Sequence, residues 1–102
     1  MAIRHVVLWE IGVDEPAMRR DTIELLSERL EALVGVIPGL LSLSAGPNSV
    51  NLAGNWDMAL VADVEDRVAL DSYAVHPAHL EVAKDLRAVA TARAAVDFEV
   101  DL

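Results

Sequence analysis

Residues 3–11 alternate in the manner of a β-strand, yet both faces of that strand are apolar in its middle, and this restricts the folds open to the chain. One face carries Ile3, His5, Val7, Trp9 and Ile11, and the other carries Arg4, Val6, Leu8 and Glu10. A strand with two apolar faces is buried on both sides of its sheet. We therefore expect a sheet that helices cover on one face and that another surface covers on the other.

Two helical regions follow from the spacing of apolar side chains and from their capping residues. The first has Asp14 as its expected N-cap and Pro16 in its first turn, and it runs for about five turns. The second lies within residues 66–90 and is broken at Pro77, because the residue before a proline is disfavoured in the α conformation. His76 is that residue, and Pro77 suits the first position of a new helix.

Three further strands are expected, over residues 40–45, 56–64 and 91–102, with the Gly-, Asn- and Pro-rich stretch 46–55 as a loop. The resulting order is the ferredoxin-like βαββαβ arrangement, an α+β fold with a four-stranded antiparallel sheet. Both helical regions then lie on one face of the sheet, and the opposite face is bare. We expect one domain, residues 1–102, that buries its bare sheet face against a second copy in a two-fold homodimer.

The composition supports a dimer and argues against several classes of partner. Hydrophobic residues make up 54% of the chain beside 25% charged residues, and this excess in a small domain suggests a second buried surface. The net charge is −9 and the eight Lys and Arg residues are scattered, so neither nucleic acid nor a membrane is expected as a partner. With no cysteine, no signal-peptide pattern and no apolar run of about 20 residues, we expect a cytoplasmic protein without disulfides.

Charged residues on the strands are assigned structural roles. Arg4 lies on the bare face, where we expect it to pair with Asp57 or Asp97, because an unpaired charge in an interface is costly. Asp97 also belongs, with Glu99 and Asp101, to a set of acidic side chains that is typical of a solvated strand edge.

Residues 73–79, Tyr-Ala-Val-His-Pro-Ala-His, hold two of the three histidines and the only tyrosine of the chain. Imidazoles change charge near neutral pH, so their clustering is chemically meaningful. His79 falls in the first turn of the expected helix, whose partial positive charge disfavours the imidazolium form. We expect a neutral His79 that can accept a proton and that hydrogen-bonds Tyr73, while His5 could orient a carbonyl group.

Three interpretations of this cluster stay open at the level of sequence. It could bind a small hydrophobic or carbonyl-containing ligand without turnover, or it could belong to a cofactor-free enzyme in which His79 is the general base. Alternatively the module is purely structural, with His76 capping a helix and His79 filling the seam between helix and sheet. Three imidazoles could also ligate zinc or copper, but nothing else in the sequence supports this, and we predict neither a metal nor a cofactor.

Three stretches resemble the stress-responsive A/B barrel (Dabb) domain family. They are the opening Ile-Arg-His-Val-Val-Leu-Trp at 3–9, the Ile-Pro-Gly turn at 37–39, and the Tyr-x-x-His-Pro-x-His signature at 73–79. The resemblance spans essentially the whole chain. It implies a ferredoxin-like domain that dimerises sheet to sheet into an α+β barrel, and a stress-responsive protein of undefined biochemical role. Some related plant proteins look like polyketide cyclases, and that likeness implies a cofactor-free lyase or isomerase.

In the cyclase-like members the pocket lies between the sheet and the helices of one subunit. The resemblance implies that His79, Tyr73 and His5 would be its catalytic residues. Those enzymes also have a tyrosine on the first helix, in the region where this chain has leucines. The residues expected to line a ligand pocket are His76, Val7, Trp9, Leu26, Leu30 and Trp56. Strand parity places both tryptophans on the side of His5.

Overall fold

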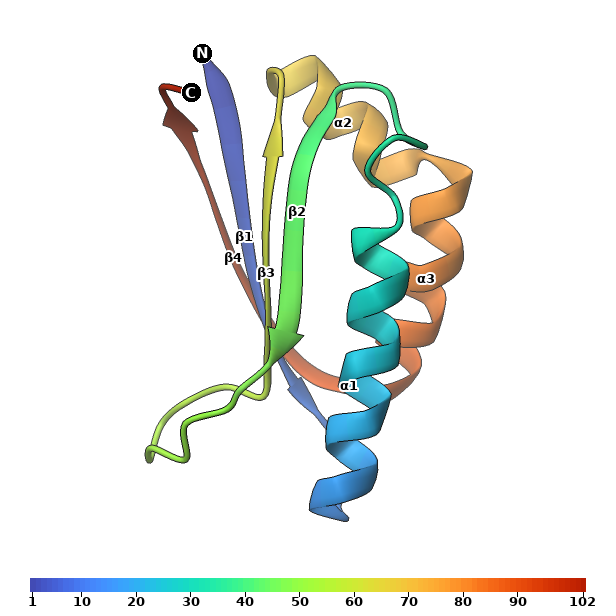
Figure 1. Ribbon diagram of the computed structural model, residues 1–102, viewed down its shortest axis with the longest axis vertical. Helices are drawn as coiled ribbons and strands as arrows, with labels where there is room; N and C mark the ends of the chain where they lie inside the picture. Colours follow the sequence, from blue (N-terminus) through green and yellow to red (C-terminus); the bar gives the residue numbers. More distant parts are fainter.

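The computed structural model describes residues 1–102 and consists of one layer of helices on one face of a sheet (Figure 1). The elements in chain order are β1 (Ala2–Ile11), α1 (Pro16–Glu31), β2 (Leu40–Pro47), β3 (Met58–Val64), α2 (Arg67–Val75), α3 (Pro77–Val89) and β4 (Ala90–Val100). The strands are antiparallel in the order β2-β3-β1-β4, so β1 and β3 are central. This confirms the predicted ferredoxin-like α+β fold. No helix is long and apolar enough to cross a membrane.

The start of α1 differs by one residue from the prediction. Pro16 occupies the first helical position, so the N-cap is Glu15 rather than Asp14. The Glu15 carboxylate accepts hydrogen bonds from the backbone N–H groups of Ala17 (3.1 Å) and Met18 (2.8 Å). The helix is also shorter than expected, because turns replace it from Ala32 onward.

The predicted break at Pro77 is confirmed. α2 begins at the N-cap Asp66, whose carboxylate accepts from the Ala69 N–H at 2.8 Å. His76 then has extended backbone angles (φ −62°, ψ 134°) between α2 and α3, and Pro77 opens α3. The His76 side chain caps α3, because its Nδ1 accepts from the N–H of Ala78 at 3.1 Å. The break therefore fixes how the last turn of α2 meets the first turn of α3.

The turn at residues 37–39 has a steric requirement for glycine. Gly39 has a φ of +84°, in the left-handed region that side chains rarely adopt. A Cβ at this position would also lie 2.8 Å from the Cβ of Ala69, on α2. Glycine at this position therefore allows the turn before β2 to pack closely against Ala69 in the first turn of α2.

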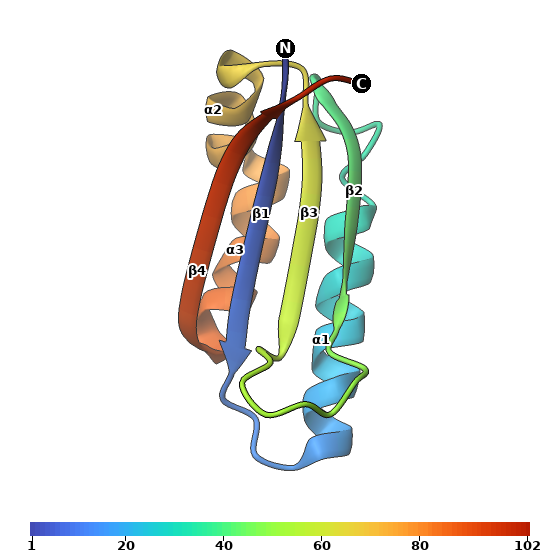
Figure 2. The same cartoon turned by 90° about the vertical axis from the view of Figure 1, so that its left-hand side faces the viewer.

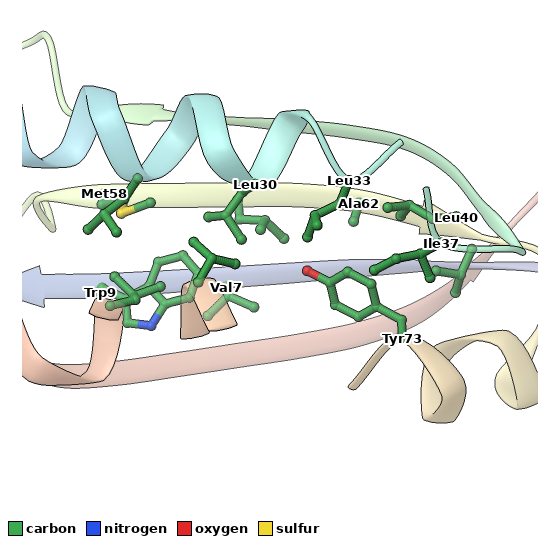
Figure 3. Close-up of a cluster of buried hydrophobic side chains, with 14 of the residues drawn as sticks. Val7, Trp9, Leu30, Leu33, Ile37, Leu40, Met58, Ala62 and Tyr73 are labelled. Atoms are coloured by element: carbon green, nitrogen blue, oxygen red, sulfur yellow. The ribbon is translucent and has the colours of Figure 1, made fainter. Parts of the chain in front are cut away.

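A single hydrophobic core fills the space between the helices and the sheet (Figure 3). Its largest fully buried side chains are Ile23, Leu30, Met58, Leu60, Val7 and Val64. They come from α1, β1 and β3, and the strand residues among them alternate with outward-facing ones. The core is thus almost entirely aliphatic and lies on one side of the sheet, as the sequence pattern predicts.

The other side of the sheet is uncovered within one chain (Figure 2). We call it the open face, and it is formed by outward-facing residues that include Val6, Leu8, Val61, Val96 and Phe98. The most exposed side chains among them are Val96, which is 63% exposed, and Phe98, which is 45% exposed. An apolar surface of this kind normally belongs to an interface.

A charged pair also lies on the open face. Arg4 pairs with Asp63, its neighbour across β1 and β3, through two hydrogen bonds of 2.9 and 3.0 Å. The bonds from the guanidinium hold the pKa of the Asp63 carboxyl below its ordinary value. The prediction of Asp57 or Asp97 as the partner is wrong, because Asp57 accepts from the Ile11 N–H and Asp97 faces the helices.

Candidate functional site

A cavity of about 320 Å³ lies between the helices and the sheet, beside the aliphatic core. Its walls are mostly apolar, with contributions from Val7 on β1, Leu30 on α1, and Leu86 on α3. Three rings and two arginines supply the polar part of the lining. A concave, largely apolar space with a few convergent polar groups is the usual form of a small-molecule site.

The three rings come from three elements and meet at one end of the cavity. His5 projects from β1 on the helix-covered side, Tyr73 comes from the last turn of α2, and His79 from the first turn of α3. The Tyr73 and His79 ring centroids are 4.4 Å apart with the planes inclined by 44°. His5 meets the edge of Tyr73 at 6.1 Å. The structure therefore brings together the three residues that the sequence analysis singled out as catalytic candidates.

The rings of Tyr73 and His79 are in contact, but the expected hydrogen bond between the two residues is not formed, and that prediction is wrong. Tyr73 therefore does not fix the tautomer of His79. The Nδ1 atom of His79 instead lies 3.2 Å from the backbone carbonyl oxygen of Ala74. A carbonyl only accepts, so this bond places the proton on Nδ1 and leaves the Nε2 lone pair free. Burial raises the pKa of Tyr73 to about 12, so its phenol stays protonated and can act as a donor.

His79 is held in its neutral form. Burial lowers its pKa below the ordinary value of 6.5 and is the largest cause. The positive charges of Arg87 and Arg93 and the nearby His5 ring lower it further, while the Ala74 bond partly offsets the shift. The direction agrees with the sequence-based expectation, although burial rather than the helix terminus is the main cause.

His5 has a carboxylate partner that the sequence analysis missed. Its Nδ1 lies 2.5 Å from Oδ1 of Asp97, which faces it directly across the β1–β4 pair. Asp97 is exposed on the edge strand β4, as expected of a solvated edge, but its strand parity also directs it toward the helix-covered side, where it meets His5. The pairing orients the His5 ring and holds a proton on Nδ1, so Nε2 is the atom available to a ligand.

Of the six residues expected to bind a ligand, Val7, Trp9 and Leu30 line the cavity. Leu26 is buried in the core instead, one turn of α1 away from Leu30, and does not reach the cavity. His76 does not reach it either, because its ring bonds the start of α3.

Trp56 lies outside the cavity, and its predicted position is wrong. β3 begins at Met58, so Trp56 belongs to the preceding loop, where strand parity does not apply. It lies in a separate hollow with Leu8 and Ala59, whose side chains belong to the open face. Trp9 therefore lies in the cavity on the helix-covered side of the sheet, and Trp56 lies beside the open face.

Two cavity residues, Arg87 and Arg93, were missed by the sequence analysis. Arg87 follows His79 and Ala83 at four-residue steps, which places the three on one side of α3. Arg93 faces Trp9 across the β1–β4 pair and shares the strand parity of Asp97. Both signals were available in the sequence, but only once the pairing register of β4 was known. No group of three or more His, Asp or Glu side chains is arranged to hold a metal ion.

A neutral, half-buried His79 makes stability depend on pH in one direction. In the unfolded chain the imidazole takes up its proton near pH 6.5, and in the folded chain only at lower pH. Between these values the unfolded state binds more protons, so the free energy of unfolding rises with pH. We expect stability to fall from about pH 7.5 to about pH 5.5, and a His79→Gln variant to lose this part of the slope.

Urea denaturation of both proteins across this range measures the effect. The quantity to compare is the difference in the free energy of unfolding between the wild type and the variant at each pH, because the remaining titratable groups contribute to both proteins alike. A difference that stays constant over the range would contradict a His79 imidazole that is held neutral by the fold.

The fold and cavity define a ferredoxin-like α+β domain with a ligand-sized space between helices and sheet. The sequence matches the stress responsive A/B barrel domain, Dabb, over residues 3–100, and the chain therefore belongs to this family. No curated protein matches the sequence.

Solved structures with the same fold include two bacterial proteins described as dimeric, ferredoxin-like and of unknown function. The one from Bacteroides fragilis is 28% identical, with a TM-score of 0.86 over 97% of this chain and 96% of that chain. The one from Thermobifida fusca is 30% identical, with a TM-score of 0.83 over 98% and 92%. A hydroxynitrile lyase from Passiflora edulis shares the fold at 13% identity, with a TM-score of 0.79 over 98% and 94%.

Proposed function

We propose that the protein binds a small, largely apolar molecule with a carbonyl group in the cavity between the helices and the sheet. The observation that carries the proposal is the convergence of His5, Tyr73 and His79 at one end of a cavity of about 320 Å³ with apolar walls. Rings that only filled a seam would leave no such space beside them.

Each of the three rings has a distinct part in binding. The Tyr73 phenol stays protonated and donates a hydrogen bond to the ligand carbonyl oxygen. The Nε2 atom of His79 carries a lone pair, because its Nδ1 faces the carbonyl oxygen of Ala74, and it accepts a hydrogen bond from a ligand hydroxyl group. Nδ1 of His5 is paired with Asp97, so its Nε2 is the atom that a ligand can reach. The apolar walls then bury the rest of the molecule.

We propose further that the protein is a homodimer that packs through the open faces of two sheets and so closes an α+β barrel. The apolar open face needs a cover, and the relatives from Bacteroides fragilis and Thermobifida fusca are described as dimeric. A two-fold axis would place Val96 and Phe98 of each copy against the same surface of the other. The cavity lies on the opposite side of the sheet, so this interface leaves it accessible.

A second candidate is a cofactor-free lyase or isomerase, related in chemistry to polyketide cyclases. It is favoured by the neutral His79, whose free Nε2 could take a proton from the carbon next to a carbonyl group. Tyr73 would then stabilise the enolate oxygen by donating its phenolic proton in a hydrogen bond. The hydroxynitrile lyase from Passiflora edulis has this fold, so the fold is compatible with lyase chemistry. Helix α1 contributes Leu30 to the cavity lining and contributes no polar side chain.

A titration with acetophenone, followed by the indole N–H signals of both tryptophans, tests the binding proposal. Trp9 lines the cavity and Trp56 lies outside it, so we expect the Trp9 signal to move and the Trp56 signal to stay. Ala74→Phe, at the cavity wall, is expected to weaken binding at least tenfold by filling the space. Ala88→Phe is the control, because Ala88 is an exposed alanine on α3 that does not line the cavity.

Acetophenone and a panel of small ketones and aldehydes that leave Trp9 unmoved would overturn the binding proposal. So would an Ala74→Phe protein that binds as well as the wild type. His79→Ala separates the two candidates. Binding that survives this substitution supports a binding protein, whereas a ligand that is turned over by the wild type and not by the variant supports the enzyme.

A further inference from the structure

Two arginines at the cavity have no partner within the protein. Four of the other arginines form ion pairs with carboxylates, namely Arg4, Arg20, Arg29 and Arg67. Arg19 donates to the Val13 carbonyl oxygen. Arg87 and Arg93 form no ion pair or hydrogen bond, although the chain has 17 acidic residues and a net charge of −9. Both side chains are exposed at the rim of the cavity, and their guanidinium groups are free to bind an anionic group there.

The arginines and the imidazoles lie toward opposite ends of the cavity. Arg87 comes eight residues after His79 on α3, which is about 12 Å along a helix. Arg93 comes four residues before Asp97 on β4, which is about 13 Å along a strand. β4 runs in the opposite direction to α3 (Figure 1). Arg87 and Arg93 are therefore both displaced from the imidazoles toward the same end of the cavity.

The cavity is therefore polarised along its length. At one end Tyr73 and His79 offer uncharged hydrogen-bonding groups, and the nearest acid, Asp97, is already paired with His5. At the other end are two positive charges beside the indole of Trp9. Apolar side chains lie between the two ends.

We propose that the ligand of this cavity is an organic acid, whose carboxylate binds Arg87 and Arg93 while its carbonyl group faces the three rings. This rests on the proposed function, since it names the class of ligand that the same cavity takes. The planar guanidinium fork matches a carboxylate and forms two parallel hydrogen bonds with it. The apolar body of the acid occupies the space between the ends. A molecule with one charged terminus and one neutral polar terminus would bind in a single orientation.

Three compounds that share one aromatic ketone test the proposal. Acetophenone has no second polar group, 4-acetylbenzamide has an uncharged one, and 4-acetylbenzoate has a carboxylate. Each is titrated into the wild type while the indole N–H signals of Trp9 and Trp56 are followed. We expect 4-acetylbenzoate to bind about tenfold more tightly than 4-acetylbenzamide, and to weaken as sodium chloride is added.

Charge-removing variants identify the groups responsible. Arg87→Gln with Arg93→Gln is expected to weaken 4-acetylbenzoate about tenfold more than it weakens acetophenone, which has no carboxylate. Lys84→Gln is the control for the loss of a positive charge from α3, because Lys84 lies on the same helix as Arg87 and outside the cavity. It should leave all three affinities unchanged.

The outcomes separate the two proposals. If no compound moves the Trp9 signal, both the proposed function and the organic-acid ligand are overturned. If acetophenone binds but 4-acetylbenzoate binds no better than 4-acetylbenzamide, the cavity remains a binding site and only the organic-acid proposal is lost. Equal weakening by Lys84→Gln and by the double arginine variant would also overturn it, because the effect would then be one of net charge alone.

Discussion

A Val96→Asp substitution is expected to convert the proposed homodimer into a monomer. Val96 is 63% exposed in the single chain and lies on the open face beside Phe98. In a two-fold interface each substitution occurs twice, so two carboxylates would lose their water without gaining a partner. One unpaired charge buried in this way costs about 3–5 kcal/mol, which weakens dimerisation by at least about a hundredfold.

Sedimentation equilibrium at micromolar protein concentration measures this effect. Val68→Asp serves as the control, because Val68 is 73% exposed on α2, on the helical side of the molecule. The control protein should sediment as a dimer and the Val96→Asp protein as a folded monomer with an unchanged far-ultraviolet circular dichroism spectrum. A monomeric wild type, or a dimer that survives Val96→Asp, would contradict the open-face interface.

The fold was accessible from sequence because its signals are local. Alternation in residues 3–11 identified a strand with two apolar faces, and Pro77 marked the end of one helix and the start of the next. The errors at element ends also have local causes. Met18 is an apolar residue near the start of α1 but is 61% exposed, because the buried residues of this helix begin at Ile23.

The site was accessible only in part, because it depends on pairing between distant segments. Strand parity and the proline break together predicted that His5, Tyr73 and His79 share one side of the sheet. The partnership of His5 with Asp97 spans 92 positions and required the exact register of β1 with β4. Trp56 was misplaced for the opposite reason, since parity was applied to a residue that precedes the strand.

The structural role of the ring cluster is tested by Tyr73→Ala, which is expected to lower the free energy of unfolding by about 3 kcal/mol. Tyr73 is 2% exposed and packs against both His79 and His5. Truncating a buried aromatic ring to alanine costs about 3–5 kcal/mol, and the value here falls at the lower end because water can enter the enlarged cavity. Loss of the ring contacts is included in this cost.

Tyr73→Phe is the matched variant that separates packing from hydrogen bonding. It keeps the ring, and the phenolic hydroxyl faces the cavity rather than a protein partner, so we expect stability within about 0.5 kcal/mol of the wild type. The same variant should weaken acetophenone binding several-fold, because the donor to the ketone oxygen is gone. Urea denaturation and the Trp9 titration measure the two effects separately. Equal stability losses in both variants would mean that the hydroxyl bonds within the protein, and Tyr73 could then not be the group that receives the ligand carbonyl.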